Sequence, residues 1–341
     1  MQDKQPGAAT LLDVANEAGV SLATASRAFN GSTRKVREDL RARVLAAAEK
    51  LNYTANAQAQ AMARGHTNVV GLVVADIADP FFSSIAAGVA AAAEEQGLLV
   101  TLGSTTRSPR REVDYLAALR GQRSRAVIIA GSRIDDAAVI DALTREIVAF
   151  EKAGGKVVAI SQAKLPVDTV VVENRAGARA LAAALAEIGY RRFAILSGPA
   201  DLLTSRDRVL GFNDGLAKAG LARADVIGGE FTRDGGYASM ADLLARGERP
   251  ECVFAVNDVM AMGAGAAARA AGLRVPDDLA LAGFDDIGPL RDLDPPVTTV
   301  QVPLGDIGRM ALDLVVTSSD TPRQRRVRGT VMLRESTPPR R

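Results

Sequence analysis

Residues 20–31 read VSLATASRAFNG, and this stretch decides the fold class of the N-terminal region. Ser21 is suited to cap a helix over residues 22–30, and Gly31 is suited to end it. The helix carries a run of small and hydroxyl-bearing side chains, followed by one basic residue, Arg27. Small side chains on the leading face allow the backbone of such a helix to approach another surface closely.

A second helix is predicted just before this stretch. Thr10 and Asp13 have the spacing of a capping box, and the apolar positions that follow predict a helix over residues 11–18. Gly19 ends that helix, so only a tight turn separates the two helices. Two short helices joined in this way form the helix-turn-helix pattern.

A third helix, predicted over residues 37–51, would complete a compact three-helix unit. Its buried face is predicted from apolar residues that are spaced three and four positions apart. These residues are Leu40, Val44, Leu45 and Ala48.

The helix-turn-helix pattern predicts a DNA-binding surface. The major groove is about 12 Å wide and admits a slim helix, whose first residues face the base edges. Leu22, Ala23 and Arg27 are the candidates for base reading. The candidates for contacts with the DNA backbone carry hydroxyl groups, and they are Thr10, Ser21, Thr24 and Ser26. The alternative is an ordinary pair of packed helices with Arg27 in solvent.

The composition excludes several classes of protein. Lys and Arg outnumber Asp and Glu by 9 to 6 in residues 1–66 and trail by 33 to 34 afterwards, which favours a polyanionic partner for the N-terminal part. Cys252 and His66 are the only residues of their types, which excludes an intrachain disulfide, a Cys/His metal cluster and a catalytic Ser/His or Cys/His pair within one chain. No metal ion or cofactor is predicted.

No membrane attachment is predicted either. Residues 1–9 are polar and lack the apolar core of a signal peptide. No apolar run approaches the roughly 18 residues that a membrane helix requires. We therefore expect a cytoplasmic protein.

From residue 69 onward, short β-branched runs alternate with alanine-rich helices. This alternation predicts parallel sheets with helical crossovers and hence a doubly wound α/β architecture. The strands are too many for one sheet, so we expect two similar halves, divided near Val172. The predicted strands cover residues 69–74, 98–103, 126–130, 156–160, 192–197, 252–256 and 280–283, and a helix is predicted over about 176–188.

Polar and aromatic residues follow several of these strands at their carboxyl ends, where doubly wound sheets bind ligands. They include Asp76, Asp79, Phe81, Phe82, Ser161, Gln162, Asn257 and Asp285. Amide and carboxylate groups beside aromatic rings suit a small polyhydroxylated ligand, because each buried hydroxyl needs a hydrogen-bonding partner. The alternatives are that Asn257 and Asp285 only cap helices and that Phe81 and Phe82 pack in the core.

Two other patterns do not support a dinucleotide-binding site or a glycosidase site. Gly263 and Gly265 have the first spacing of a dinucleotide fingerprint, but the third glycine is absent and both lie in a predicted helix. Asp285 and Asp286 are adjacent, which should point them apart rather than across a glycosidic bond.

The N-terminal region resembles the lactose-repressor (LacI/GalR) family of bacterial transcription regulators. The resemblance rests on TLLDVANEAGVSLATASRAFNG, from residue 10, and on RVLAAAEKLNYTANAQAQAMARG, from residue 43. It implies that Leu22, Ala23 and Arg27 read bases.

The same resemblance implies a hinge helix that enters the minor groove as one of a dimer pair. Its candidate residues are Asn56, Ala59 and Met62, of which Met62 would wedge between base pairs. The sequence departs from the family at three positions. Met62 replaces a common leucine, Ala55 replaces a common proline, and Arg37 stands where a serine often caps the third helix.

The rest of the chain resembles the family's core, which is similar to periplasmic sugar-binding proteins with an effector held between two subdomains. The resemblance implies effector contacts from Arg206, Arg208, Phe231, Asn257 and Asp285, with Phe81 and Phe82 on the opposite wall near Asp79. Ser161 and Gln162 stand where many sugar-responsive members have an Asp-Arg pair, so the ligand chemistry of this chain departs from theirs at that point. For Arg206 and Arg208 the alternative is a solvated surface position.

We predict an α/β repressor with an N-terminal three-helix headpiece over residues 1–54, a hinge helix over 55–66 and a core of two parallel-sheet subdomains over 67–341. The N-subdomain would span about 67–172 and 299–328, and the C-subdomain about 173–298 and 329–341. The predicted partners are pseudo-palindromic double-stranded operator DNA, a small-molecule effector, most simply a sugar, and a second copy of the chain. The tail has no leucine heptads, so a homodimer is expected, located at the bacterial nucleoid through DNA binding.

Two other classes of protein are alternatives to a repressor. A solute-binding protein without a DNA role would have no use for the helix pair before residue 69. A sugar-processing α/β enzyme would need a matched acid and base, and the sequence shows no such pair.

Overall fold

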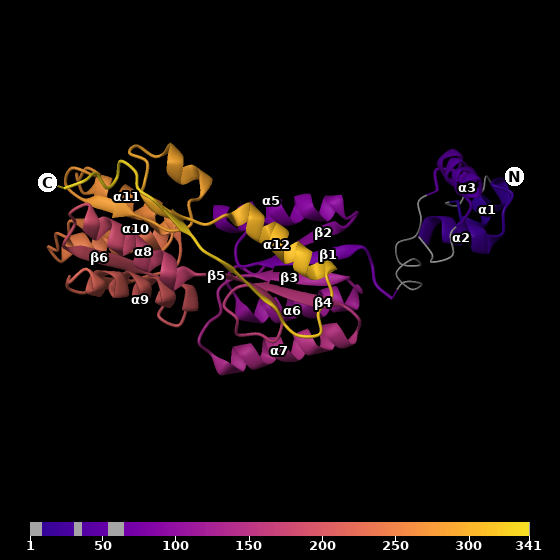
Figure 1. The fold of residues 1–341 in the computed structure, drawn as a ribbon, viewed down its shortest axis with the longest axis horizontal. Helices are drawn as coiled ribbons and strands as arrows, with labels where there is room; N and C mark the ends of the chain where they lie inside the picture. The colour runs from indigo at the N-terminus through magenta and orange to yellow at the C-terminus, as the bar shows by residue number, and fades with distance from the viewer. Residues whose placement is uncertain (1–8, 31–35, 54–64, 341) are drawn as a thin grey trace, which may run out of the picture. The chain divides into compact units, whose positions relative to one another are not determined.

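The computed structural model describes residues 9–30, 36–53 and 65–340. The predicted hinge residues Asn56, Ala59 and Met62 lie outside the described residues. The chain divides into two compact units, Met1–Thr67 and Asn68–Arg341, which are drawn in Figure 1.

The N-terminal unit holds three helices, α1 (Leu11–Glu17), α2 (Leu22–Asn30) and α3 (Glu38–Lys50), close to the predicted bounds. Between α1 and α2, Gly19 takes a φ of +62°, which favours glycine over other residues. The helices enclose a core of Val14, Ala15, Ala18, Ala25, Ala28, Val44, Ala47 and Ala48. The prediction for α3 was wrong at Leu45, which is 45% exposed, because Ala47 turns toward the core in its place.

The second unit contains two parallel sheets. The first has the strand order β11-β5-β4-β3-β1-β2. Its strands are β1 (Val69–Val74), β2 (Leu99–Ser104), β3 (Ala126–Ala130), β4 (Lys156–Ile160), β5 (Asp168–Val172) and β11 (Gln324–Val327). Its helices are α5 (Pro80–Glu95), α6 (Pro109–Gly121), α7 (Ala137–Lys152) and α12 (Leu304–Val316). We call these elements the N-subdomain.

The second sheet has the order β7-β6-β8-β9. Its strands are β6 (Phe193–Ser197), β7 (Asp225–Gly228), β8 (Cys252–Ala255) and β9 (Ala280–Ala282), and its helices are α8 (Asn174–Glu187), α9 (Leu203–Lys218), α10 (Arg233–Ala245) and α11 (Asp258–Ala270). We call these elements the C-subdomain. The antiparallel pair β10 (Thr299–Gln301) and β12 (Thr330–Met332) belongs to the segments that return between the subdomains.

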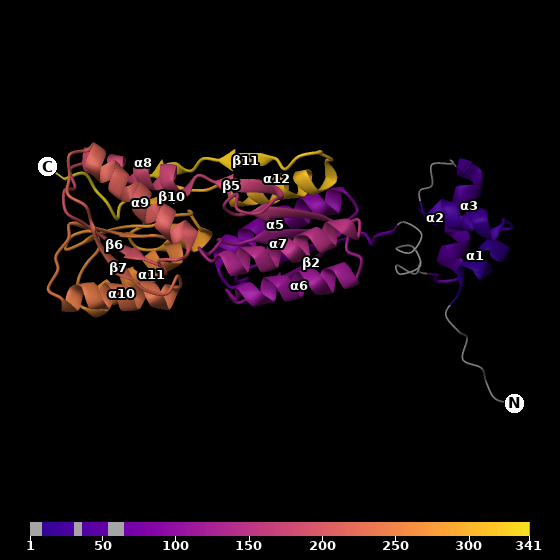
Figure 2. The ribbon, with the colours of Figure 1, turned by 90° about the horizontal axis from the view of Figure 1, so that it is seen from below.

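Each sheet is covered on both faces, as continuous apolar strands require. In the N-subdomain, α5 and α12 cover one face and α6 and α7 cover the other (Figures 1 and 2). Successive side chains along a strand point to opposite faces. Leu72 and Ile128 belong to the core cluster with α5, whereas Val73 and Val127 belong to the cluster with α6 and α7.

Glycines allow neighbouring helices to pack closely. A Cβ atom at Gly263 in α11 would overlap the Arg233 carbonyl oxygen at the start of α10, and one at Gly236 in α10 would overlap Met260. Gly88 and Gly308 have the same role between α5 and α12. Gly263 is therefore a helix-packing residue and has no part in a nucleotide-binding loop.

The predicted fold class is confirmed, and β1, β3 and β4 have their predicted bounds. Five strands, β5, β7, β10, β11 and β12, lie outside the seven predicted strand ranges, and each is three to five residues long. β7 and β11 are largely exposed, so no continuous apolar run marks these two, whereas β5 holds three consecutive valines at 170–172 and was missed. None of the described helices is long and apolar enough to span a membrane.

Candidate functional sites

Helix α2 buries one side and presents the other. Ala25 and Ala28, two of the five small residues in this helix, pack in the three-helix core. Leu22 is 49% exposed, Ala23 is also exposed, and Arg27 is partly buried. The predicted base-reading residues thus lie away from the apolar core, where a DNA groove could reach them.

The hydroxyl groups of this unit take part in capping. The Ser21 Oγ accepts from the Thr24 amide at 3.1 Å and lies 2.8 Å from the Thr24 Oγ1. The Thr10 hydroxyl accepts from the Asp13 amide at 3.3 Å, and the Asp13 carboxylate accepts from the Thr10 amide at 2.8 Å. The Thr10 hydroxyl also donates to the Asp13 carboxylate at 2.7 Å, and this bond together with the one from the Thr10 amide lowers the pKa of Asp13. Thr10 therefore starts α1, and its predicted contact with the DNA backbone stays a prediction.

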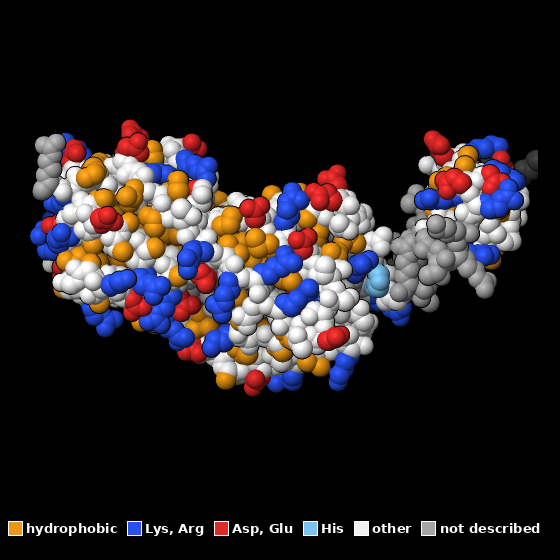
Figure 3. All heavy atoms as spheres, viewed as in Figure 1, with side chains coloured by type: hydrophobic (Ala, Val, Ile, Leu, Met, Phe, Trp, Pro, Cys, Tyr) orange, Lys and Arg blue, Asp and Glu red, His pale blue; other side chains and the backbone are white. Residues whose placement is uncertain are grey.

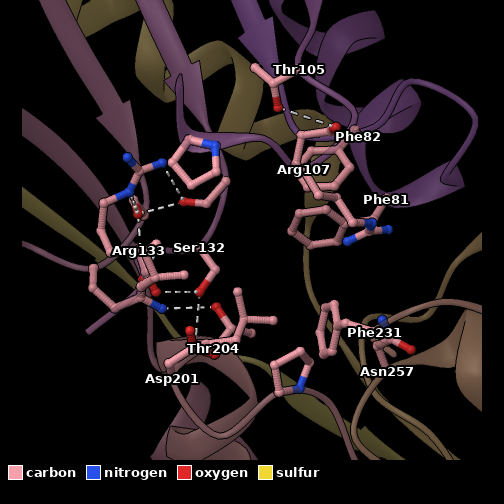
Figure 4. Close-up of a pocket in the computed structure, with 18 of the residues that line it drawn as sticks. Phe81, Phe82, Thr105, Arg107, Ser132, Arg133, Asp201, Thr204, Phe231 and Asn257 are labelled. Atoms are coloured by element: carbon pink, nitrogen blue, oxygen red, sulfur yellow. Dashed lines mark hydrogen bonds between the residues drawn. The ribbon is translucent and has the colours of Figure 1, made fainter. Parts of the chain in front are cut away.

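A pocket of about 400 Å³ lies between the carboxyl ends of the two sheets in the second unit. This volume is within the range of about 300 to 1,000 Å³ that is usual for small-molecule sites. Eight of the nine predicted effector residues line it: Asp79, Phe81, Phe82, Ser161, Arg208, Phe231, Asn257 and Asp285. Both subdomains contribute, and Figure 4 shows Phe81, Phe82 and Arg107 on the side of the N-subdomain, across from Phe231 and Asn257.

On the N-subdomain side, the start of α5 forms one wall. The Asp79 carboxylate caps α5 by accepting from the Phe81 amide at 3.0 Å, and it also accepts from the Arg107 guanidinium at 3.3 Å. Burial raises the pKa of Asp79, and both hydrogen bonds act in the opposite direction. Phe82 is 6% exposed and belongs to the apolar core as well as to the pocket, whereas Phe81 is only partly buried.

On the C-subdomain side, Arg208 of α9 organises the wall. Its two terminal nitrogens donate to both Asp285 oxygens at 2.7 and 3.1 Å, and its Nε donates to the Asn174 side chain at 2.8 Å. The guanidinium carbon also lies 3.8 Å from the centre of the Phe284 ring. Arg208 is only 2% exposed, so it is not a solvated surface residue.

Two buried carboxylates near this wall have raised pKa values. Burial raises the pKa of Asp285 to about 6, although Arg208 pulls it down. Burial, with a further contribution from the Asp285 charge, raises the pKa of Asp258 to about 7. The neighbouring Asp286 points away to Arg334 and Gln301, as expected for adjacent carboxylates.

The sequence reasoning missed a second buried ion pair in the pocket. The Arg133 guanidinium donates to both Glu112 oxygens at 2.8 and 2.7 Å, and its Nε donates to Ser161 at 3.1 Å. Arg133 follows β3 and could have been found by the rule that singled out the residues after the other strands. Glu112 lies in α6, and nothing in the sequence pairs it with Arg133.

Beside Arg133 and Ser161, hydrogen bonds at the rim of the pocket join the two subdomains. Gln162 donates to the Thr204 hydroxyl at 2.8 Å, and the Thr204 amide donates to the Ser132 hydroxyl at 3.0 Å. An isolated β-bridge links Ile134 to Leu202.

The prediction for Arg206 needs correction. Arg206 does not line the pocket and instead makes an ion pair with Asp135 across this rim at 2.6 Å, with 41% of its side chain exposed. Two positions along α9 amount to about 200° around the helix axis. Arg206 and Arg208 therefore point in nearly opposite directions.

Asn257 is both a cap and a pocket residue. Its Oδ1 accepts from the Met260 amide at 2.9 Å at the start of α11, and within the described residues its amide nitrogen has no protein partner. In the described parts of the chain, no cluster of His, Cys, Asp and Glu side chains is arranged to hold a metal ion.

Comparisons with known proteins identify the family. The family model "Bacterial regulatory proteins, lacI family" matches residues 10–56, and "Periplasmic binding proteins and sugar binding domain of LacI family" matches residues 67–337. The chain belongs to the LacI family. It is therefore a DNA-binding transcription regulator and not an enzyme.

Three known proteins show how far the likeness extends. The transcriptional regulator DegA of Bacillus subtilis is 32% identical over 301 residues, which cover 88% of each chain. A solved complex of the transcriptional regulator CelR with cellobiose is 31% identical, with a TM-score of 0.69 over 96% of this chain and 99% of that one. The lac repressor dimer bound to operator and the anti-inducer ONPF shares the fold, with 24% identity and a TM-score of 0.82 over 97% of this chain and 100% of that one.

Proposed function

We propose that this regulator is a repressor whose affinity for operator DNA changes when a sugar binds in the pocket between its two subdomains. The observation that carries the proposal is that eight predicted residues, spread over the sequence from Asp79 to Asp285, line a single pocket. A binding site assembled from both subdomains can couple ligand binding to their relative position.

Recognition of DNA is assigned to α2. Leu22 and Ala23 offer apolar contact at the start of the helix, for example to a thymine methyl group. Arg27 donates only to the Ala23 carbonyl at 2.9 Å among the described residues, so its terminal nitrogens can reach a guanine edge or a phosphate. Ser21, Thr24 and Ser26 are proposed to contact phosphates beside them.

The chemistry of the pocket supports a sugar. Asp285 accepts from Arg208 at both oxygens and keeps lone pairs for ligand hydroxyls, while Asn257 offers its amide nitrogen. Phe81 and Phe231 supply ring faces that can cover the apolar side of a sugar ring. Cellobiose bound to the related CelR is consistent with this class of ligand.

We further propose that the protein acts as a homodimer on a pseudo-palindromic operator at the bacterial chromosome. Large apolar side chains are exposed on the edge strand β2, at Leu99 (68%) and Leu102 (45%), and in the C-subdomain at Val226 and Tyr237. Figure 3 shows one face of the second unit, on which apolar side chains lie among charged ones. The solved lac repressor of the same fold is a dimer on operator DNA.

The proposed mechanism is thermodynamic linkage. A sugar that binds one arrangement of the two subdomains more tightly shifts the population toward that arrangement. A coupling free energy of about 1 to 3 kcal/mol would change operator affinity roughly 5- to 150-fold. The residues proposed to carry the change to DNA are those of the hinge, Asn56, Ala59 and Met62.

The test is fluorescence anisotropy of labelled DNA from the region upstream of the protein's own gene. The chain has no tryptophan, so the label must be on the DNA. Saturable binding that exceeds binding to random DNA, and that one sugar shifts at fixed salt, is the expected result. If no sugar shifts binding to an operator that the protein selects, the effector part of the proposal fails while the DNA-binding part stands.

A further inference from the structure

We propose that the pocket selects an uncharged effector and rejects the phosphorylated or carboxylated form of the same molecule. This inference rests on the proposed function and narrows its ligand class. It follows from how the charged side chains of the pocket are already paired.

Every arginine that lines the pocket has a carboxylate partner within the chain. Arg208 pairs with Asp285 at 2.7 Å, Arg133 pairs with Glu112 at 2.7 Å, and Arg107 pairs with Asp79 at 3.3 Å. The first two pairs are bidentate and buried. An anionic ligand that bound Arg133 or Arg208 through paired hydrogen bonds would have to displace Glu112 or Asp285, which would leave a buried negative charge unpaired at a large energetic cost.

The two buried arginines, Arg133 and Arg208, each keep a single free donor. A guanidinium has five N–H groups. Arg208 uses four of them, on Asp285, Asn174 and the Val256 carbonyl. Single donors of this kind match the separate oxygens of a polyol, whereas a phosphate needs several donors directed at one point. Arg107 keeps more donors, including a buried Nε without a partner in the described structure, but the carboxylates of Asp76 and Asp79 lie 3.8 and 3.3 Å from its guanidinium and oppose an anion there.

The acidic residues of the lining outnumber the basic ones. The lining holds Asp79, Glu112, Asp201, Glu230 and Asp285 against Arg107, Arg133 and Arg208. Asp201 and Glu230 are exposed and form no ion pair among the described residues. The field in the pocket is therefore unfavourable for an anion before any contact is made.

The remaining lining suits a neutral ring with hydroxyl groups. Thr105, Ser132 and Thr204 provide hydroxyls, Gln162 and Asn257 provide amides, and Phe81 and Phe231 provide ring faces. Figure 4 shows Ser132 and Thr204 across the pocket from Phe81 and Phe231, with Thr105 beside Phe82. One side can cover the apolar face of a ring while the other pairs its hydroxyls.

The experiment is isothermal calorimetry of the full chain with matched pairs of compounds: glucose, galactose, ribose, cytidine and adenosine, each beside its monophosphate, and glucose also beside glucuronate. We expect the neutral member of the pair that binds to be about 100-fold tighter than its charged counterpart. Equal or tighter binding of a phosphate or carboxylate would overturn the inference and leave an effector-regulated repressor intact. Tight binding of only a nucleoside would uphold the uncharged class and overturn the sugar, and binding of neither member of any pair would overturn both.

A variant tests whether the paired charges cause the selectivity. Glu112→Gln removes the countercharge of Arg133, and we expect it to reduce the ratio of the affinities for the neutral and the charged member at least tenfold. The matched control is Glu146→Gln, because Glu146 pairs with Arg120 at 2.7 Å outside the pocket and should change no ligand affinity. If Glu112→Gln does not fold, the double variant Asp201→Asn with Glu230→Gln serves instead. It should reduce the same affinity ratio about threefold. An unchanged preference in a folded variant would overturn the charge argument.

Discussion

The two arginines proposed to serve the DNA site and the effector pocket have opposite surroundings. Arg27 lies partly exposed on α2, where its only hydrogen bond among the described residues goes to a backbone carbonyl of its own helix. Arg208 lies buried in the core unit, where Asp285, Asn174 and the Val256 carbonyl occupy most of its donors.

This difference is the basis for proposing that one chain binds a polyanion at Arg27 and a neutral ligand beside Arg208. An arginine without a carboxylate partner keeps its charge available for phosphates and guanine edges. An arginine held in a buried ion pair contributes hydrogen-bonding direction while its charge is neutralised. Substitutions at these arginines and at their partners test whether these surroundings decide the two roles.

The largest effect is expected when Arg208 is removed. Arg208→Ala leaves Asp285 buried without its partner, so the core should lose about 3 to 5 kcal/mol of stability together with the response to effector. Urea unfolding and the operator assay measure both. The matched control is Arg206→Ala, which breaks an exposed ion pair worth about 1 kcal/mol or less and should keep the response. Equal losses in the two variants would contradict the separation of the two arginines.

The second effect concerns pH. Burial raises the pKa of Asp258 from 3.8 to about 7, so between these values the folded protein holds a proton that the unfolded chain releases. Stability should therefore fall by about 2 to 4 kcal/mol as pH rises from about 4 to about 7. Asp285, with its pKa raised to about 6, acts in the same direction.

Urea unfolding at pH 5 and pH 7.5 checks this prediction, with Asp258→Asn as the comparison. The variant should lose less stability over this range than the parent, because its amide does not titrate. Asp168, whose pKa is lowered to about 2 by Arg323 and Lys156 against the effect of burial, changes stability only below about pH 4 and does not interfere. A parent and variant with the same pH dependence would show that Asp258 is ionised throughout.

The third effect concerns DNA. Arg27→Ala should abolish operator selection, with a loss of about 1 to 3 kcal/mol in operator affinity, and leave effector binding intact. Anisotropy against operator and random DNA at the same salt concentration measures the selection. Arg37→Ala is a suitable control in the same unit, because Arg37 is highly exposed and pairs with Asp39. A variant that binds operator as the parent does would remove Arg27 from base reading.

The smallest effect is expected at Thr10. Thr10→Ala removes the capping box of α1 and should destabilise the N-terminal unit by about 1 kcal/mol. Amide hydrogen exchange of α1 in the full chain reports this loss without interference from the core. Thr10→Ser keeps the hydroxyl and should exchange like the parent. If Thr10→Ala weakens DNA binding without faster exchange, the hydroxyl acts on the DNA backbone instead.

Much of the secondary structure could be predicted because its signals are local. The capping box at Thr10 and Asp13 fixed the start of α1, and the β-branched runs fixed β1, β3 and β4. Local signals failed where the chain is polar or short, as in the exposed strand β11. They also failed at Leu45. Helical spacing shows that an apolar residue could join a buried face, but it does not show which face of the helix the other two helices cover.

The sequence by itself determined the helix-turn-helix unit, the doubly wound core and the set of strand ends at which a pocket should lie. Only the tertiary structure decided which of these residues meet. Arg208 and Asp285 are 77 positions apart and Arg133 and Glu112 are 21 apart, while Arg206, two positions from Arg208, faces another partner. Periodicity is a property of neighbouring residues and can be read from the chain, but an ion pair requires two distant segments to arrive at one point, and only the packed sheets and helices bring them there.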